Sequence, residues 1–137
     1  MKFSLESSTG NMIIAYDVGS IQVHCTSRSE QDNARAQVQK IYSSSIITPD
    51  TLVENWPPHT PADLDVLHMD QVLGFQPEIV ILGTGKRLHF PAAAIIQVCH
   101  QAGVGIEAMD TGAACRTYNI LASEGRRVAA ALLMIEE

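Results

Sequence analysis

The first third of the chain carries apolar residues at alternate positions. Two short segments each place three apolar side chains on one face: Met12, Ile14 and Tyr16 in the first, and Ile21, Val23 and Cys25 in the second. Strict alternation is typical of a strand that is buried on one face only. Residues 17–20 supply Asp and Gly between the two segments. The pattern therefore predicts a β-hairpin at the start of the chain.

The rest of the first half predicts one more strand and a proline-rich connection. Residues 26–33 are polar and are expected to form a loop, whereas residues 41–47 have the composition of a strand that ends at the Thr-Pro-Asp of 48–50. Three prolines fall within residues 55–61. Because proline lacks a backbone N–H and fixes φ, this segment is expected to be a short surface connection without regular structure.

The second half changes to continuous apolar runs and helical spacing. Residues 63–73 predict a short helix that Gly74 ends, and the apolar run of 77–82 predicts a strand covered on both faces. The remaining expected elements are a helix opened by Pro91 and ended by Gly103, a strand over 104–109, a helix over 113–123 capped by Asp110, and a strand over 128–135. Strands that alternate with helices imply parallel pairing through a right-handed crossover.

Composition and charge narrow the class of protein. The chain has 137 residues, 46% of them hydrophobic and 18% charged, which suits a single domain over residues 1–137 with one well-formed core. The formal charge of −6 weighs against a nucleic-acid partner, which requires a basic face. A negative total still leaves room for local positive pockets.

The cysteines and the apolar stretches indicate a reducing compartment. Cys25, Cys99 and Cys115 are odd in number and contain no CxxC pair, so no disulfide framework is expected. The first residues hold no signal-like apolar run, and the longest apolar stretch, 128–135, is too short for membrane insertion. A cytoplasmic location is the expectation.

The candidate chemistry lies in the two loops that follow the central strands. In parallel α/β sheets, ligands bind beyond the carboxyl ends of the strands. The candidate ligand-binding residues are Gly83, Thr84, Gly85, Lys86 and Arg87 in the first loop and Asp110, Thr111, Gly112 and Arg116 in the second. Glycines permit close approach of the backbone, free N–H groups bind anions, and the three basic residues add positive charge. In the alternative interpretation the glycines make a tight turn, and the basic residues are solvated or paired with Asp110.

Other reactive residues offer weaker candidates. Cys115 near a helix N-terminus could act as a nucleophile with His89 as its base, or be a small buried apolar residue. Cys25 and Cys99 are expected in the core. The five histidines are scattered without the spacing of a metal site, so neither a metal nor another cofactor is expected. Trp56 is either an exposed contact or a plug at the edge of the core.

Four blocks of sequence together resemble a known family. They are SSSIITPD at 43–50, Trp56, PEIVILGTG at 77–85 and MDTGAACRTYN at 109–119. The chain resembles the small Mth-type α/β domain family, whose eukaryotic relatives include a mitochondrial complex I assembly factor and an adipogenesis-associated protein. The positions that match the family motifs are Gly83, Gly85, Asp110, Thr111, Cys115, Arg116 and Asn119.

The resemblance implies both a fold and a function class. The fold is a three-layer β/β/α-type domain with a central mixed, partly parallel sheet, a hairpin-rich N-terminal half and flanking helices. No enzymatic activity is established for the family, so no catalytic residue is carried over. The first functional hypothesis is a non-enzymatic accessory or assembly factor that binds an unknown protein partner. The alternative is a protein that binds a small molecule or anion, conceivably an enzyme, through loops 83–87 and 110–116.

Overall fold

The N-terminal part forms a small antiparallel sheet. The computed structural model describes residues 10–25 and 37–136, so the loop predicted at 26–33 lies outside the described residues. Strands β1 (Met12–Asp17), β2 (Ser20–Cys25) and β3 (Gln37–Ile41) pair in the order β1-β2-β3. The predicted hairpin is thereby confirmed.

The face predicted for β1 is wrong, because the strand contains a bulge. Ile13 pairs with Val23, but the next pair joins Ala15 to Gln22, which leaves Ile14 as an extra residue. A bulge reverses the alternation beyond it. Ile13 and Tyr16 therefore both face the core, whereas Ile14 does not belong to it. The face predicted for β2 is confirmed, since Ile21 and Val23 are buried there.

The single strand predicted over 41–47 is also wrong. It is two strands in two different sheets, because β3 ends at Ile41 and β4 (Ser45–Ile47) starts a second ladder. Between them the Ser44 carbonyl accepts a hydrogen bond from the Trp56 backbone N–H at 2.9 Å. This bond lies outside both ladders and marks the point where the chain changes sheet.

The second sheet is mixed and has five strands. The order is β5-β4-β8-β6-β7, with β5 (Leu52–Val53), β6 (Ile79–Thr84), β7 (Gly105–Met109) and β8 (Val128–Leu133). Strand β6 is parallel to both β7 and β8, which confirms the predicted parallel pairing, whereas β4 is antiparallel to β8. All residues of β8 are buried, as expected for a strand covered on both faces.

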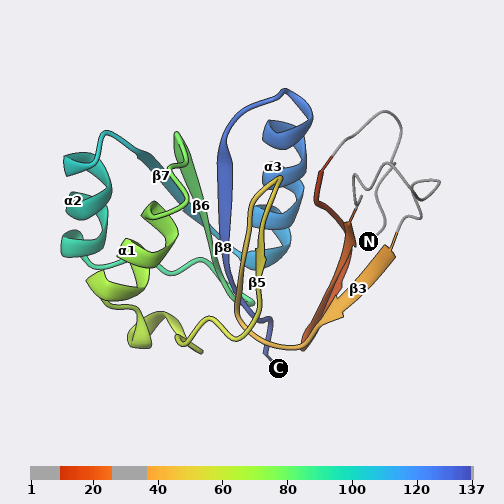
Figure 1. Cartoon of the computed structure of the whole chain (residues 1–137). Helices are drawn as coiled ribbons and strands as arrows, with labels where there is room; N and C mark the ends of the chain where they lie inside the picture. The colour runs from red at the N-terminus through yellow and green to blue at the C-terminus, as the bar shows by residue number, and fades with distance from the viewer. Residues whose placement is uncertain (1–9, 26–36, 137) are drawn as a thin grey trace.

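The helices cover the two faces of the second sheet, as Figure 1 shows. They are the 3₁₀ turn η1 (Pro61–Asp63), α1 (Val66–Leu73), α2 (Ala93–Gln101) and α3 (Thr111–Ser123). Helices α1 and α2 pack together on one face, and α3 contacts β6, β8 and also β1. The three-layer α/β fold with a central mixed sheet, an N-terminal hairpin and flanking helices is thus confirmed.

Helix boundaries follow the expected capping with two corrections. Asp110 is the N-cap of α3, and its carboxylate accepts a hydrogen bond from the Ala113 N–H at 2.9 Å, as predicted. The helix itself begins earlier than predicted, at Thr111. Pro91 does not open α2, because the N-cap is Ala92 and the helix begins at Ala93.

Two apolar clusters fill the interior on either side of the five-stranded sheet. One lies between this sheet, α3 and the three-stranded sheet, and contains Ile13, Ile21, Ile81 and Tyr118. The other lies under α1 and α2, and its largest member is Trp56. Only 1% of the surface of Trp56 is exposed, so it is a core residue and not a surface contact. Residues 55–61 therefore turn inward, in part, and are not purely a surface connection.

None of the helices among the described residues is long and apolar enough to cross a membrane.

Candidate functional site

The two candidate loops meet at the carboxyl edge of the five-stranded sheet. Gly85 follows β6 and Thr111 begins α3, and the Thr111 N–H donates to the Gly85 carbonyl at 2.8 Å. The Gly85 N–H in turn donates to Thr111 Oγ1 at 2.8 Å. The same hydroxyl donates to the Leu133 carbonyl at the end of β8 at 2.6 Å. Thr111 therefore joins the ends of two parallel strands to the start of α3.

These contacts occupy some of the N–H groups at which an anion site is expected. Besides the Gly85 N–H, the His89 N–H donates to Thr84 Oγ1 at 3.0 Å, and the Ala113 N–H is held by the Asp110 carboxylate. The Thr84 hydroxyl in turn donates a hydrogen bond to the Arg87 carbonyl at 2.7 Å. The loop after β6 and the start of α3 thus provide hydrogen-bond partners for each other's backbone groups, which is the arrangement that the tight-turn interpretation expects.

Two of the candidate glycines are required by packing. A Cβ on Gly83 would lie 2.9 Å from Thr111 Oγ1 and 3.1 Å from the Ala114 Cβ. A Cβ on Gly112 would lie 2.8 Å from the Tyr16 ring. Glycine at these positions lets α3 approach β6 on one side and β1 on the other. Their structural role accounts for them without a ligand.

The basic residues of the two loops do not converge on one pocket. Arg116 is half-buried, donates a hydrogen bond to the Tyr16 hydroxyl and places its guanidinium 5.9 Å from the centre of that ring. Lys86 and Arg87 are exposed and line a shallow hollow of about 290 Å³. Its other walls come from residues 59–61, His89 and the end of the chain near Glu136, and not from residues 110–116. The second loop is therefore not part of this hollow.

Cys115 lies in the core and not in a reactive site. Its side chain is 0% exposed within the cluster that contains Ala114 and Tyr118, whereas His89 is exposed. Burial raises the pKa of the Cys115 thiol to about 12, although Arg116 opposes this shift. A nucleophile must be accessible and deprotonated. The pairing of Cys115 with His89 as nucleophile and base is contradicted by this burial, and the thiol is a packing residue.

Alkylation of Cys115 is expected to be very slow in the folded protein. With a thiol pKa near 12 instead of 9.0, the thiolate fraction at pH 8 falls by a factor of about 10³. Labelling with iodoacetamide, followed by peptide mass spectrometry, should leave the Cys115 peptide unmodified while the urea-unfolded chain is labelled. Equal labelling of Cys115 in the folded and unfolded protein would contradict its place in the core.

No group of three or more His, Cys, Asp or Glu side chains suited to a metal ion occurs among residues 10–25 and 37–136.

A feature that sequence reasoning missed lies beside the hollow. Phe90 is 84% exposed and Leu88 is 46% exposed, in the connection between β6 and α2. They directly follow the basic pair Lys86 and Arg87. The sequence signal was an apolar residue on each side of His89. Neither of these residues belongs to a helical or strand pattern of apolar positions that would predict its burial. We call residues 86–90 the basic–apolar loop.

The chain matches proteins named as assembly factors. A stretch 34% identical over 89 residues, which covers 65% of this chain and 51% of the relative, occurs in "NADH dehydrogenase [ubiquinone] 1 alpha subcomplex assembly factor 3" of Danio rerio. Another relative is the "13 kDa major membrane protein" of Francisella tularensis, 36% identical over 66 residues, with 48% of this chain and 54% of that protein covered. The chain thus spans about half the length of these curated relatives.

Solved structures share the fold over nearly the whole chain. A crystal structure of a Bordetella parapertussis protein has a TM-score of 0.77 at 36% identity and covers 93% of this chain and 98% of that one. A Bordetella pertussis protein described as a Mth938-like domain has a TM-score of 0.76 at 30% identity, covering 100% and 94%. The family model for "Protein of unknown function (DUF498/DUF598)" matches residues 15–133. The chain therefore belongs to the DUF498/DUF598 family, and its fold is that of a Mth938-like domain.

Proposed function

We propose that this protein is a non-enzymatic accessory or assembly factor that binds a partner protein through the basic–apolar loop. The observation that carries the proposal is the exposure of Phe90, at 84%, beside a half-exposed Leu88. Burying a side chain of this size stabilises a complex by about 1.5–3 kcal/mol. Aromatic residues and arginine are also the types that are enriched at the centres of protein interfaces.

The loop is held in one conformation before any partner arrives. The Thr84 hydroxyl bonds the Arg87 carbonyl and accepts from the His89 N–H, so a buried side chain fixes the loop at two points. Pro91 restricts φ directly after Phe90. An ordered loop loses little conformational entropy on binding, so more of the contact energy appears as affinity.

Charge indicates the chemistry of the partner. The whole chain has a formal charge of −6, yet Lys86 and Arg87 place two positive charges beside the two exposed apolar side chains. An acidic segment with an apolar anchor complements this surface, because opposite charges steer the encounter and the apolar anchor covers Phe90. A basic partner would be repelled at this point.

The relatives point to the assembly of a respiratory complex. The Danio rerio protein that is 34% identical to this chain over 89 residues is named an assembly factor of NADH dehydrogenase. We extend that role to this chain, with the basic–apolar loop as the surface that holds an acidic segment of a subunit or a second assembly factor. Binding of an anion by loops 83–87 and 110–116 is less well supported, because the Gly85 and Ala113 N–H groups already have partners and the second loop does not line the hollow beside Lys86 and Arg87.

Replacing Phe90 with aspartate should abolish the function and leave the fold intact. In cells that lack the native copy, Phe90→Asp should fail to restore assembled NADH dehydrogenase on native gels, because aspartate removes the apolar anchor and repels an acidic partner. The matched control is Val38→Asp, which makes the same change at an exposed residue of β3. Full complementation by Phe90→Asp would overturn the role of the loop.

A further inference from the structure

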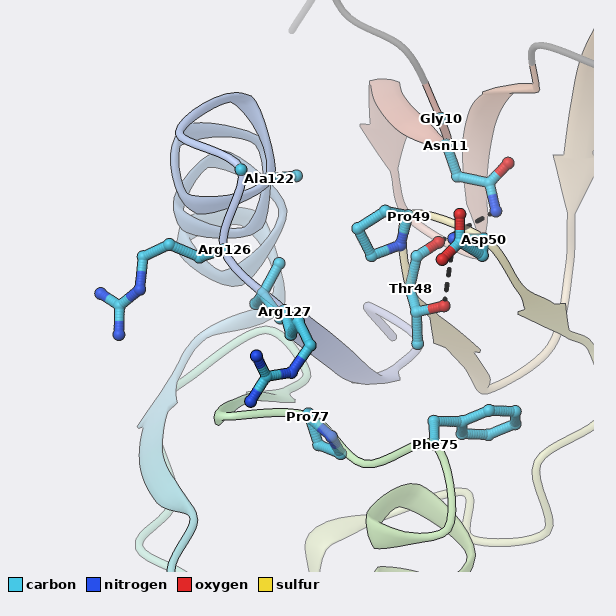
Figure 2. A pocket seen from close by; sticks show the side chains of 12 residues that line it. Gly10, Asn11, Thr48, Pro49, Asp50, Phe75, Pro77, Ala122, Arg126 and Arg127 are labelled. Atoms are coloured by element: carbon cyan, nitrogen blue, oxygen red, sulfur yellow. Dashed lines mark hydrogen bonds between the residues drawn. The ribbon is translucent and has the colours of Figure 1, made fainter.

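A second cavity lies at the end of the five-stranded sheet where the parallel strands β6 and β8 begin. The basic–apolar loop lies at the other end, after the last residue of β6. The volume of the cavity is about 510 Å³, and it is bounded by the start of β1, the turn between β4 and β5, and the connections that lead into β6 and β8. Figure 2 shows these four segments facing a common space. The size falls within the range of about 300–1,000 Å³ that is typical of small-molecule sites.

Arg127 supplies a positive charge to this cavity from a fixed backbone. The Glu78 N–H donates to the Arg127 carbonyl at 2.8 Å, and the Arg127 N–H donates to Glu78 Oε1 at 3.0 Å. That same carboxylate lies 3.6 Å from Arg126 Nε. The Arg127 N–H, and to a smaller extent the charges of Arg126 and Arg127, hold the pKa of Glu78 below its usual value.

The two neighbouring arginines therefore differ in availability. Arg126 is engaged by Glu78, and in Figure 2 its side chain points away from the wall formed by Pro49 and Asp50. No hydrogen bond or ion pair joins the Arg127 guanidinium to another residue in the part of the chain that the structure describes. In Figure 2 it lies beside Pro77, and Arg127 is one of the residues that line the cavity.

The opposite wall is rigid and carries one negative charge. The Asn11 side-chain amide donates to the Thr48 carbonyl at 3.0 Å and to the Thr51 carbonyl at 3.1 Å, which ties β1 to the turn between β4 and β5. That turn presents the exposed carboxylate of Asp50. Phe75 and Pro77 form an apolar side.

We propose that this cavity binds a small organic anion with one carboxylate or phosphate group and an apolar body. The anionic group pairs with the Arg127 guanidinium, whose planar fork suits both groups. The apolar body lies against Phe75 and Pro77, and a hydroxyl or ammonium group of the ligand can donate to Asp50. The Asp50 carboxylate disfavours ligands that carry negative charge at both ends.

The test is an amide-resolved NMR titration of the full chain with benzoate and, in a separate arm, with phenyl phosphate. The two arms distinguish a carboxylate from a phosphate ligand, and benzyl alcohol serves as the neutral probe. We expect at least one anion to shift the amides of residues 48–51 and 125–128, and benzyl alcohol to bind more weakly. Arg127→Gln should weaken anion binding at least about tenfold, because a charge-assisted hydrogen bond is lost.

The matched control is Lys40→Gln, which removes one positive charge from an exposed residue of β3. It should bind the anion with unchanged affinity. The proposal is overturned if Arg127→Gln binds as well as the wild type, if the shifts map to residues 84–89, or if neither anion perturbs the cavity. These outcomes are independent of the role proposed for the basic–apolar loop, because the two surfaces share no residue.

Discussion

Replacing Trp56 with alanine is expected to lower the free energy of unfolding by about 3–5 kcal/mol. Trp56 is one of the largest fully buried side chains among the described residues and packs in the cluster under α1 and α2. Its ring lies edge-on to His68, with 6.2 Å between ring centres. Alanine leaves a cavity in the middle of this cluster, and surrounding elements such as β4 and α1 can close it only in part.

The effect is measured by urea unfolding followed by circular dichroism, because Trp56 is the one tryptophan and its fluorescence is lost in the variants. The control is Trp56→Phe. The Trp56 Nε1 has no hydrogen-bond partner within the described part of the chain, so phenylalanine forfeits volume but no bond. We expect it to cost far less than alanine, and equal losses for the two variants would contradict the packing role.

Replacing Asn119 with leucine is expected to cost about 2–5 kcal/mol, because it leaves two buried backbone groups without partners. Asn119 Oδ1 accepts from the Ile13 N–H at 2.9 Å, and its Nδ2 donates to the Ile13 carbonyl at 2.7 Å. The Asn119 side chain thus forms with Ile13 the two hydrogen bonds that a neighbouring strand would form, next to the bulge in β1. It attaches the three-stranded sheet to α3.

Two measurements test this role of Asn119. The unfolding free energy should fall in Asn119→Leu but change little in Ile120→Ala, which alters the next, exposed residue of the same helix. In addition, the Ile13 amide should exchange with solvent faster in the leucine variant. Unchanged protection of that amide would show that Asn119 does not hold β1.

The second half of the fold was predictable because its signals are local. A continuous apolar run marked β6, and Asp110 marked the start of α3 through a hydrogen bond that spans only three residues. Parallel pairing of β6 with its neighbours follows from the alternation of strands and helices. The meeting of Gly85 with Thr111 follows in turn, since parallel strands end at the same edge.

The features that escaped prediction depend on distant partners. Beside the bulge in β1, the backbone of Ile13 is hydrogen-bonded to Asn119, which is 106 residues away in sequence. The break between β3 and β4 involves the Trp56 backbone, which no local pattern around residue 44 reveals. For Cys115, the sequence left open a reactive thiol beside Arg116 or a small buried residue, and the packing of α3 places the thiol in the core.

In the candidate site too, local properties of the sequence were predictable, whereas features that depend on the fold were not. Lys86 and Arg87 were identified from their charge, which is a property of the residue alone. Leu88 and Phe90 were missed, because apolar residues are assigned to the core by default and only the fold shows which of them stay exposed. That the Gly85 N–H is occupied is likewise visible only once Thr111 is in place.

The most direct test of the basic–apolar loop is site-specific photo-crosslinking in living cells. A benzophenone amino acid at position 90 should give one discrete adduct with a partner protein, and the adduct should disappear when Lys86 and Arg87 are both replaced with glutamate. The same amino acid at position 38, an exposed apolar site on β3, should not give that adduct. Identical adducts from both positions, or none from position 90, would contradict a protein-binding role for this loop.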